Sequence, residues 1–306
     1  MTITKDEVKG HLAAMVTNVI FGLNIPVTKS LLCGWMSPMG YTLTRMLFGL
    51  SMFWAISLLR KKETVARRDM PVIAVAGLLG LVATQIAFAA ALKFTTPTVY
   101  ALITALSPIV VLLLSISFLH ETITRRDIFG ILLGIVGVIL IISHNSNGAS
   151  GSNHALGIGI SAAGVISYAA YIIIMRKVSA KYDPATLMKW MFLTAVLVIS
   201  PFSIGDLPDQ RIYSPEATLI PMLLLGFALI FSSLIGFFLM PFALKRIKAA
   251  TAGAYINMQP IIAAAVAVVV GQDIFSWDKA VAVLFVITGV YIVMQSKNTK
   301  NEARQI

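Results

Sequence analysis

The chain has 306 residues, of which 58% are hydrophobic and only 12% charged. A soluble globular domain needs about a quarter of its residues charged, so this composition excludes that class. The single cysteine, Cys33, excludes a disulfide framework and leaves no cysteine cluster for a metal.

Apolar residues come in blocks of roughly 20, the length at which a helix crosses a bilayer core of ~30 Å. Continuous runs of this kind do not fit the alternating pattern of a β-barrel. The sequence therefore predicts an all-α membrane protein with ten transmembrane helices, at residues 10–31, 38–59, 71–92, 97–118, 127–143, 154–175, 184–204, 216–240, 249–270 and 277–295.

The net charge of +11 follows the predicted topology. With the N-terminus inside, 18 of the 24 basic residues fall in inner segments and three (Lys93, Arg211 and Lys279) in outer loops. This asymmetry is typical of a multi-pass protein of the bacterial inner membrane with both termini cytoplasmic. We expect the excess charge to meet membrane lipids and not nucleic acid.

The two halves of the chain show a weak internal repeat. Residues 91–142 and 243–294 align without a gap, and each half carries a proline in the middle of its fourth span, Pro108 and Pro260. Two unrelated apolar stretches remain the alternative. Because five is an odd number, the second five-helix repeat would enter the membrane inverted, as in alternating-access carriers. The predicted units are a first repeat at 1–143, an outer linker at 144–153 and an inverted repeat with a short tail at 154–306.

Several stretches resemble the EamA family of the drug/metabolite transporter superfamily. They are FGLNIPVTK in span 1, ALSPIVVLLLSISFLHE in span 4 and GILLGIVGVILII in span 5, with counterparts YINMQPIIAAAVAVVVGQD and VAVLFVITGVYIV in the second half. The resemblance implies a central cavity lined by spans 1–4 and 6–9. Phe21 stands where the family usually has tryptophan, and Asp273 where glutamate is commoner.

Polar side chains inside spans 1 and 6 are candidates to line this cavity, because unsatisfied polar groups are costly in hydrocarbon. Asn24 lies on one helical face of span 1 with Thr17, Phe21 and Thr28. Tyr168 and Tyr171 occupy the mirrored positions of span 6. The alternative is that these groups only join helices to one another.

Spans 4 and 9 provide a second set of candidates. Ser107 and Gln259 each precede a proline, which frees a backbone carbonyl about one turn earlier, although such a proline can also be a plain kink. Tyr100 and Tyr255 lie near them on the same helices. Gln85 in span 3 is a further candidate.

Arg45 is the cation farthest inside a span. It could bind a carboxylate or phosphate of the substrate, or extend to the outer headgroups and orient the helix. The predicted substrate-binding residues are thus Asn24, Arg45, Gln85, Tyr100, Ser107, Tyr168, Tyr171, Tyr255 and Gln259, with no catalytic or metal-binding residue.

All 13 acidic residues lie in tails, loops or span ends. Proton-coupled export of drug cations normally needs a buried carboxylate, which disfavours that function. The sequence favours a monomeric secondary transporter that works by alternating access without a cofactor and takes a small molecule. We expect an exporter of amino acids or related zwitterions. The alternatives are multidrug cation efflux and a membrane-embedded lipid-modifying enzyme.

Overall fold

The computed structural model describes residues 5–60, 63–119, 153–205, 207–247 and 258–277, with short pieces within 125–137, 252–256 and 280–292. This part of the chain is helical and contains no strand. Its elements are α1 (Lys5–Leu32), α2 (Pro38–Leu58), α3 (Met70–Gly77), η1 (Leu78–Ala83), α4 (Thr84–Phe94), α5 (Pro97–Thr104), α6 (Ser107–Leu119), α8 (His154–Ser179), α9 (Pro184–Ser203), η2 (Arg211–Tyr213), α10 (Leu219–Phe227), η3 (Ala228–Gly236), α11 (Phe237–Leu244) and α13 (Met258–Val269).

Five of the described helical stretches are long and apolar enough to cross a membrane: Lys5–Leu32, Met70–Phe94, His154–Met175, Pro184–Ser203 and Leu219–Leu244. α2 spans 21 residues at the second predicted position, and shorter apolar helices cover Pro97–Val111 and Met258–Val269. Eight of the ten predicted spans therefore coincide with helices. Most of the predicted spans 127–143 and 277–295 lie outside the described residues.

Three helices begin in the same way, with a polar cap followed by proline. Ser37, Thr96 and Asp183 each accept a hydrogen bond from a backbone N–H of the first turn, and a proline is the first residue of α2, α5 and α9. A side-chain oxygen satisfies an otherwise unpaired N–H there, and proline has no N–H to leave unpaired. These short motifs determine where the helices start.

The third span of each half contains a π-helix at the same place. η1 joins α3 to α4, and η3 joins α10 to α11. In η1 the carbonyl of Leu79 accepts the N–H of Thr84, five residues later. The same carbonyl also accepts the hydroxyls of Thr84 and of Ser167 on α8. A π-helix is uncommon and often marks a functional site.

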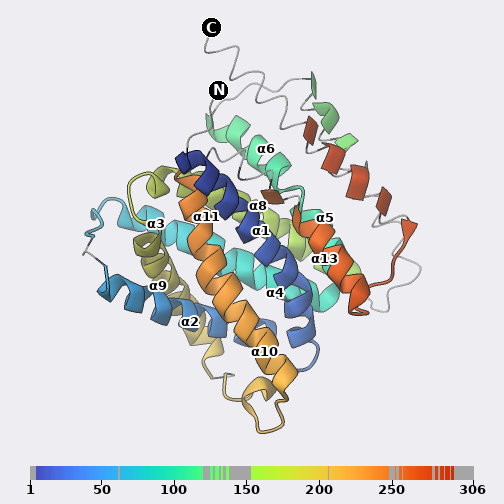
Figure 1. Cartoon of the computed structure of the whole chain (residues 1–306), viewed down its shortest axis with the longest axis horizontal. Coiled ribbons are helices and arrows are strands. Elements are labelled where there is room, and N and C mark those ends of the chain that lie inside the picture. Colours follow the sequence, from blue (N-terminus) through green and yellow to red (C-terminus); the bar gives the residue numbers. More distant parts are fainter. Residues whose placement is uncertain are drawn as a thin grey trace.

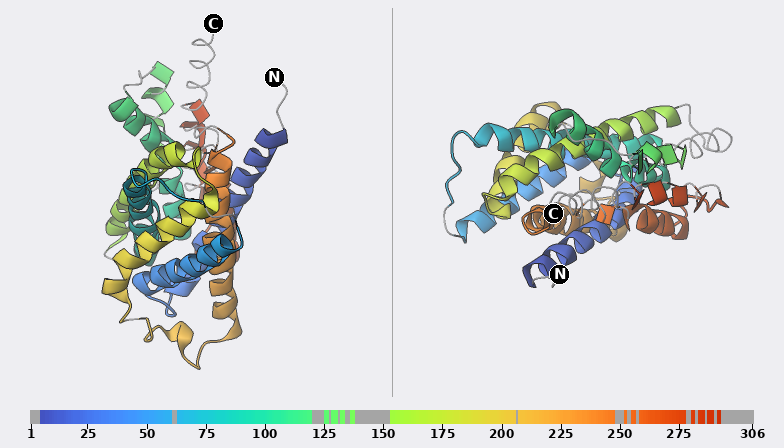
Figure 2. Two further views of the ribbon diagram at one scale, coloured as in Figure 1. Left: turned by 90° about the vertical axis from the view of Figure 1, so that its left-hand side faces the viewer. Right: turned by 90° about the horizontal axis from the view of Figure 1, so that it is seen from above.

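The first helix of each half packs against helices of the other half. α1 packs against α13 and against η3 and α11 of the second half, while α8 packs against α5 and α6 and against η1 and α4 of the first. Figure 1 shows α1 lying between the α10–α11 rod and α13. α2 and α9, the second helix of each half, run side by side (Figures 1 and 2). This symmetry supports the two-repeat fold, with α1 and α8, the helices of the first and sixth predicted spans, at its centre.

Candidate functional site

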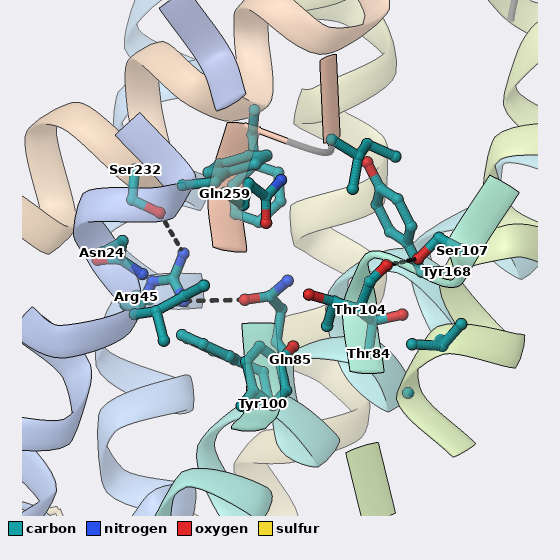
Figure 3. Close-up of a pocket in the computed structure, with 17 residues that line it drawn as sticks. Asn24, Arg45, Thr84, Gln85, Tyr100, Thr104, Ser107, Tyr168, Ser232 and Gln259 are labelled. Carbon is teal, nitrogen blue, oxygen red and sulfur yellow. Dashed lines mark hydrogen bonds between the residues drawn. The ribbon is translucent and has the colours of Figure 1, made fainter. Parts of the chain in front are cut away.

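A cavity lies between the two halves, where α1, α2, α4, α5, α8 and η3 meet. Its volume, taken as the space that the centre of a water molecule can occupy, is about 80 Å³. It is lined by Phe21, Asn24, Ile25, Arg45, Thr84, Gln85, Phe88, Tyr100, Thr104, Ser107, Gly164, Val165, Tyr168, Ser232, Phe237, Ile256 and Gln259. Both repeats contribute to the lining, and Figure 3 shows its polar side chains.

Arg45 on α2 is fully buried at the cavity wall, with 1% of its surface exposed. Its Nε donates to Ser233 (2.8 Å), Nη1 to Oε1 of Gln85 (2.8 Å) and Nη2 to Ser232 (2.9 Å). The guanidinium carbon also lies 5.2 Å from the ring centre of Tyr41. The hypothesis that Arg45 extends to the outer headgroups is therefore wrong, because neutral groups on α4 and η3 hold it inside the protein.

The hydrogen bonds of Arg45 leave part of the guanidinium available. A guanidinium has five N–H donors, and three of them bind these neutral oxygens. One N–H on each terminal nitrogen has no protein partner among the described residues. Guanidinium N–H groups are good donors to the oxygens of a carboxylate. The arrangement can bind an anion without first breaking an ion pair.

The π-helix η3 supplies the two serines that hold Arg45. Ser232 and Ser233 are consecutive, so on an ideal α-helix their side chains would point about 100° apart. Here both hydroxyls accept from Arg45, and Ser233 also donates to the carbonyl of Ala228, five residues earlier. The wider π turn thus places two hydroxyls on one guanidinium.

The opposite wall of the cavity is uncharged and rich in hydroxyls. It carries Tyr100, Thr104 and Ser107 of the fourth span and Tyr168 of α8 (Figure 3). The hydroxyl of Ser107 donates to the carbonyl of Thr104. The hydroxyl of Tyr168 is buried and has no protein partner in the described part of the chain. This wall can therefore offer a hydroxyl to a bound solute.

Two amide side chains complete the lining near α1. Gln259 donates to Oδ1 of Asn18 (2.7 Å), which ties α13 to α1. Asn24 lies near Arg45 in Figure 3, and its Oδ1 is buried without a protein partner among the described residues. A carbonyl oxygen in this position can accept a hydrogen bond from a solute.

The structure brings together seven of the nine predicted site residues: Asn24, Arg45, Gln85, Tyr100, Ser107, Tyr168 and Gln259. Tyr171 and Tyr255 do not line the cavity, so their predicted placement is wrong. Tyr171 packs on Gly80 of η1, where a Cβ would lie 2.6 Å from the ring. Tyr255 lies with its hydroxyl 3.1 Å from Nδ1 of His11. Each ring fills a gap between helices instead.

The prediction missed Ser232 and Ser233, the partners of Arg45. A signal was present, since FALIFSSLIG places two adjacent hydroxyls in an otherwise apolar run. Buried polar groups need partners, and a buried arginine needs several. The pairing across 188 residues of sequence was not visible without the fold.

Arg45 is the only charged residue among the described residues that line the cavity. The described part of the chain also contains no cluster of three or more histidine, cysteine or acidic side chains that could hold a metal ion. The site is therefore positive and rich in uncharged hydrogen-bonding groups.

Comparison with known proteins identifies the family. A model described as the EamA-like transporter family matches residues 8–143 and 155–295. The chain belongs to this family. It is thus a multi-pass membrane transporter of the drug/metabolite transporter superfamily, and the family model matches it once in each half.

Three relatives are named as uncharacterized transporters. YetK of Bacillus subtilis is 24% identical over 76% of this chain and 70% of its own length. YyaM of the same organism is 25% identical over 79% of this chain and 80% of its own. A protein of Archaeoglobus fulgidus is 24% identical, covering 86% and 90%. A solved crystal structure, 18% identical, covers 95% of this chain and 99% of its own with a TM-score of 0.64, which confirms the fold.

Proposed function

We propose that this transporter moves small solutes that carry a carboxylate, namely amino acids or related zwitterions, by alternating access. We further propose that it exports them across the bacterial inner membrane. The observation that carries the substrate class is the buried guanidinium of Arg45, which lines the cavity and has only neutral partners among the described residues. A negative group on the solute would supply the missing countercharge.

The size of the cavity supports a small solute. The centre of one buried water needs about 10–15 Å³ of accessible space. The 80 Å³ of the cavity therefore corresponds to roughly five to eight waters. At ~30 Å³ of liquid volume each, that is about 150–240 Å³, the size of an amino acid.

The zwitterion is supported by the groups around Arg45. Asn24 also lines the cavity, and its carbonyl oxygen, which has no protein partner among the described residues, is an acceptor for an ammonium. The distant hydroxyl of Tyr168 can bind a polar side chain of the solute. Drug-cation efflux is disfavoured, because no carboxylate stands among the lining residues to attract a cation.

The test is transport by proteoliposomes with a panel of labelled amino acids and organic acids, followed by variants. Arg45→Gln should weaken binding of the transported solute by about 10- to 150-fold, since charged hydrogen bonds contribute about 1.5–3 kcal/mol. Gln85→Glu is the sharper variant. It keeps the side-chain shape but places a carboxylate 2.8 Å from Nη1 of Arg45, where it competes with the carboxylate of the solute.

The matched control is Arg211→Gln, which removes an exposed cation outside the cavity and should leave transport unchanged. The carboxamide analogue of the transported solute should bind wild type weakly and respond little to Arg45→Gln. Equal transport by wild type, Arg45→Gln and Gln85→Glu, with normal expression and melting temperature, would contradict the proposed substrate class.

A further inference from the structure

A second cationic site lies outside the cavity, on the seam between α2 and α9. The ammonium of Lys189 on α9 lies 4.4 Å from the ring centre of Trp54 and 5.3 Å from that of Trp190. The two rings meet edge to face, 6.1 Å apart. The same ammonium donates to the hydroxyl of Ser57 (3.1 Å). Two aromatic faces and one hydroxyl therefore hold this cation in place.

In the described part of the chain no carboxylate balances the charge of Lys189. Arg60 and Lys181 form salt bridges with Asp183 and Asp69, whereas no described carboxylate lies within 4 Å of Lys189. An ammonium has three N–H donors, and the hydroxyl of Ser57 takes one. The two indole faces stabilise the ammonium but carry no countercharge, so its net positive charge is open to an anionic ligand.

The position of the site selects the ligand. Lys189 lies five residues into α9, about 7.5 Å from its start, and Trp54 and Ser57 lie in the last turn of α2. Trp54 is 39% exposed on the outer surface of the protein. Tryptophan and lysine at this depth are typical of the boundary between hydrocarbon and headgroups. The ring of Phe192 on α9 packs against Gly49 of α2, and neither Lys189 nor the three residues around it are among those that line the cavity.

We propose that Lys189, Ser57, Trp54 and Trp190 form a binding site for the phosphate of an anionic phospholipid. The phosphate supplies the countercharge of Lys189, while the indoles contact the glycerol and acyl part of the lipid. The site lies outside the solute cavity. The proposal therefore concerns a lipid partner of the transporter and not its substrate.

The experiment measures the melting temperature of the purified protein in a mild nonionic detergent with added phosphatidylglycerol, phosphatidylcholine or inorganic phosphate. Wild type should gain stability with phosphatidylglycerol, little with phosphatidylcholine and none with inorganic phosphate. Lys189→Gln should weaken phosphatidylglycerol binding about fivefold, the contribution of one lysine at an anionic surface. Lys189→Arg should keep it.

Ser57→Glu keeps Lys189 but places a carboxylate beside its ammonium. This variant should therefore lose the gain in melting temperature with phosphatidylglycerol, even if Lys189→Gln folds poorly. Arg211→Gln, on the opposite side of the predicted topology, is the control and should respond as wild type does. An equal gain in wild type, Lys189→Gln and Ser57→Glu would overturn the site. An equal gain with phosphatidylcholine or inorganic phosphate would overturn an anionic lipid as its ligand.

Discussion

Tyr168 and Tyr171 are three residues apart on α8 but have different surroundings. Tyr168 lines the cavity with a hydroxyl that has no protein partner among the described residues, while Tyr171 is buried in the apolar core beside Gly80. Their ring centres lie 5.7 Å apart, so they are neighbours in one packed unit. Tyr168 is half-buried at the cavity, whereas Tyr171 is buried in the core.

This pair gives a residue-scale prediction. Tyr168→Phe should weaken binding of the transported solute about 2- to 12-fold, since a neutral hydrogen bond contributes roughly 0.5–1.5 kcal/mol. Its melting temperature should not fall, because no protein hydrogen bond is lost. Tyr171→Phe is the control and should leave solute affinity unchanged. Binding titrations and thermal melts of both variants check this, and an affinity loss confined to Tyr171→Phe would place the solute on the other side of α8.

The residues of the site could be predicted from sequence better than their contacts. Polar side chains in apolar spans are costly, and this physical rule found seven of the lining residues. Tyr171 shows where the rule ends. Its position on the helix is only about 60° from that of Tyr168, well within the uncertainty of a face deduced from periodicity. The small residue that receives its ring, Gly80, lies on another span.

The fourth span is two short helices because proline interrupts its hydrogen bonding. In a continuous helix the carbonyl of Thr104 would accept the N–H of residue 108, but Pro108 has none. The hydroxyl of Ser107 donates to this carbonyl instead. The sequence predicted the freed carbonyl, and the structure adds that the adjacent serine satisfies it. The π-helices η1 and η3 were not predicted, because no composition signal distinguishes a π turn from an α turn in an apolar run.

At the scale of the element, Ser107→Ala should therefore leave the carbonyl of Thr104 without its hydroxyl partner. We expect a loss of about 1–3 kcal/mol in stability, the cost of an unsatisfied buried polar group, seen as a lower melting temperature. Ser51→Ala is the matched control. Its hydroxyl also donates to a carbonyl one turn earlier, that of Leu47, but on the exposed face of an unbroken helix. Equal losses in both variants would mean that Ser107 has no special part in the break.

On the scale of the whole molecule, the loop before α3 joins the two halves at one end of the bundle. Asp69 accepts hydrogen bonds from Tyr182 (2.8 Å) and Lys181, and Arg60 pairs with Asp183. The hydrogen bond from Tyr182 and then that from Lys181 lower the pKa of Asp69, so it stays charged at neutral pH. These contacts lie between the second and third spans of one half and the first two helices of the other.

The charge distribution predicts the orientation of this end in the membrane. From the positions of lysine and arginine we expect this loop in the cytoplasm and Cys33 outside. Cys33 is exposed and is the only cysteine, so it serves as its own reporter. In intact cells it should react with a membrane-impermeant maleimide. Thr64→Cys in a Cys33→Ser background is also exposed but should react only after the cells are opened. The opposite pattern would invert every loop, and would place the Lys189 site in the outer leaflet and not the inner one.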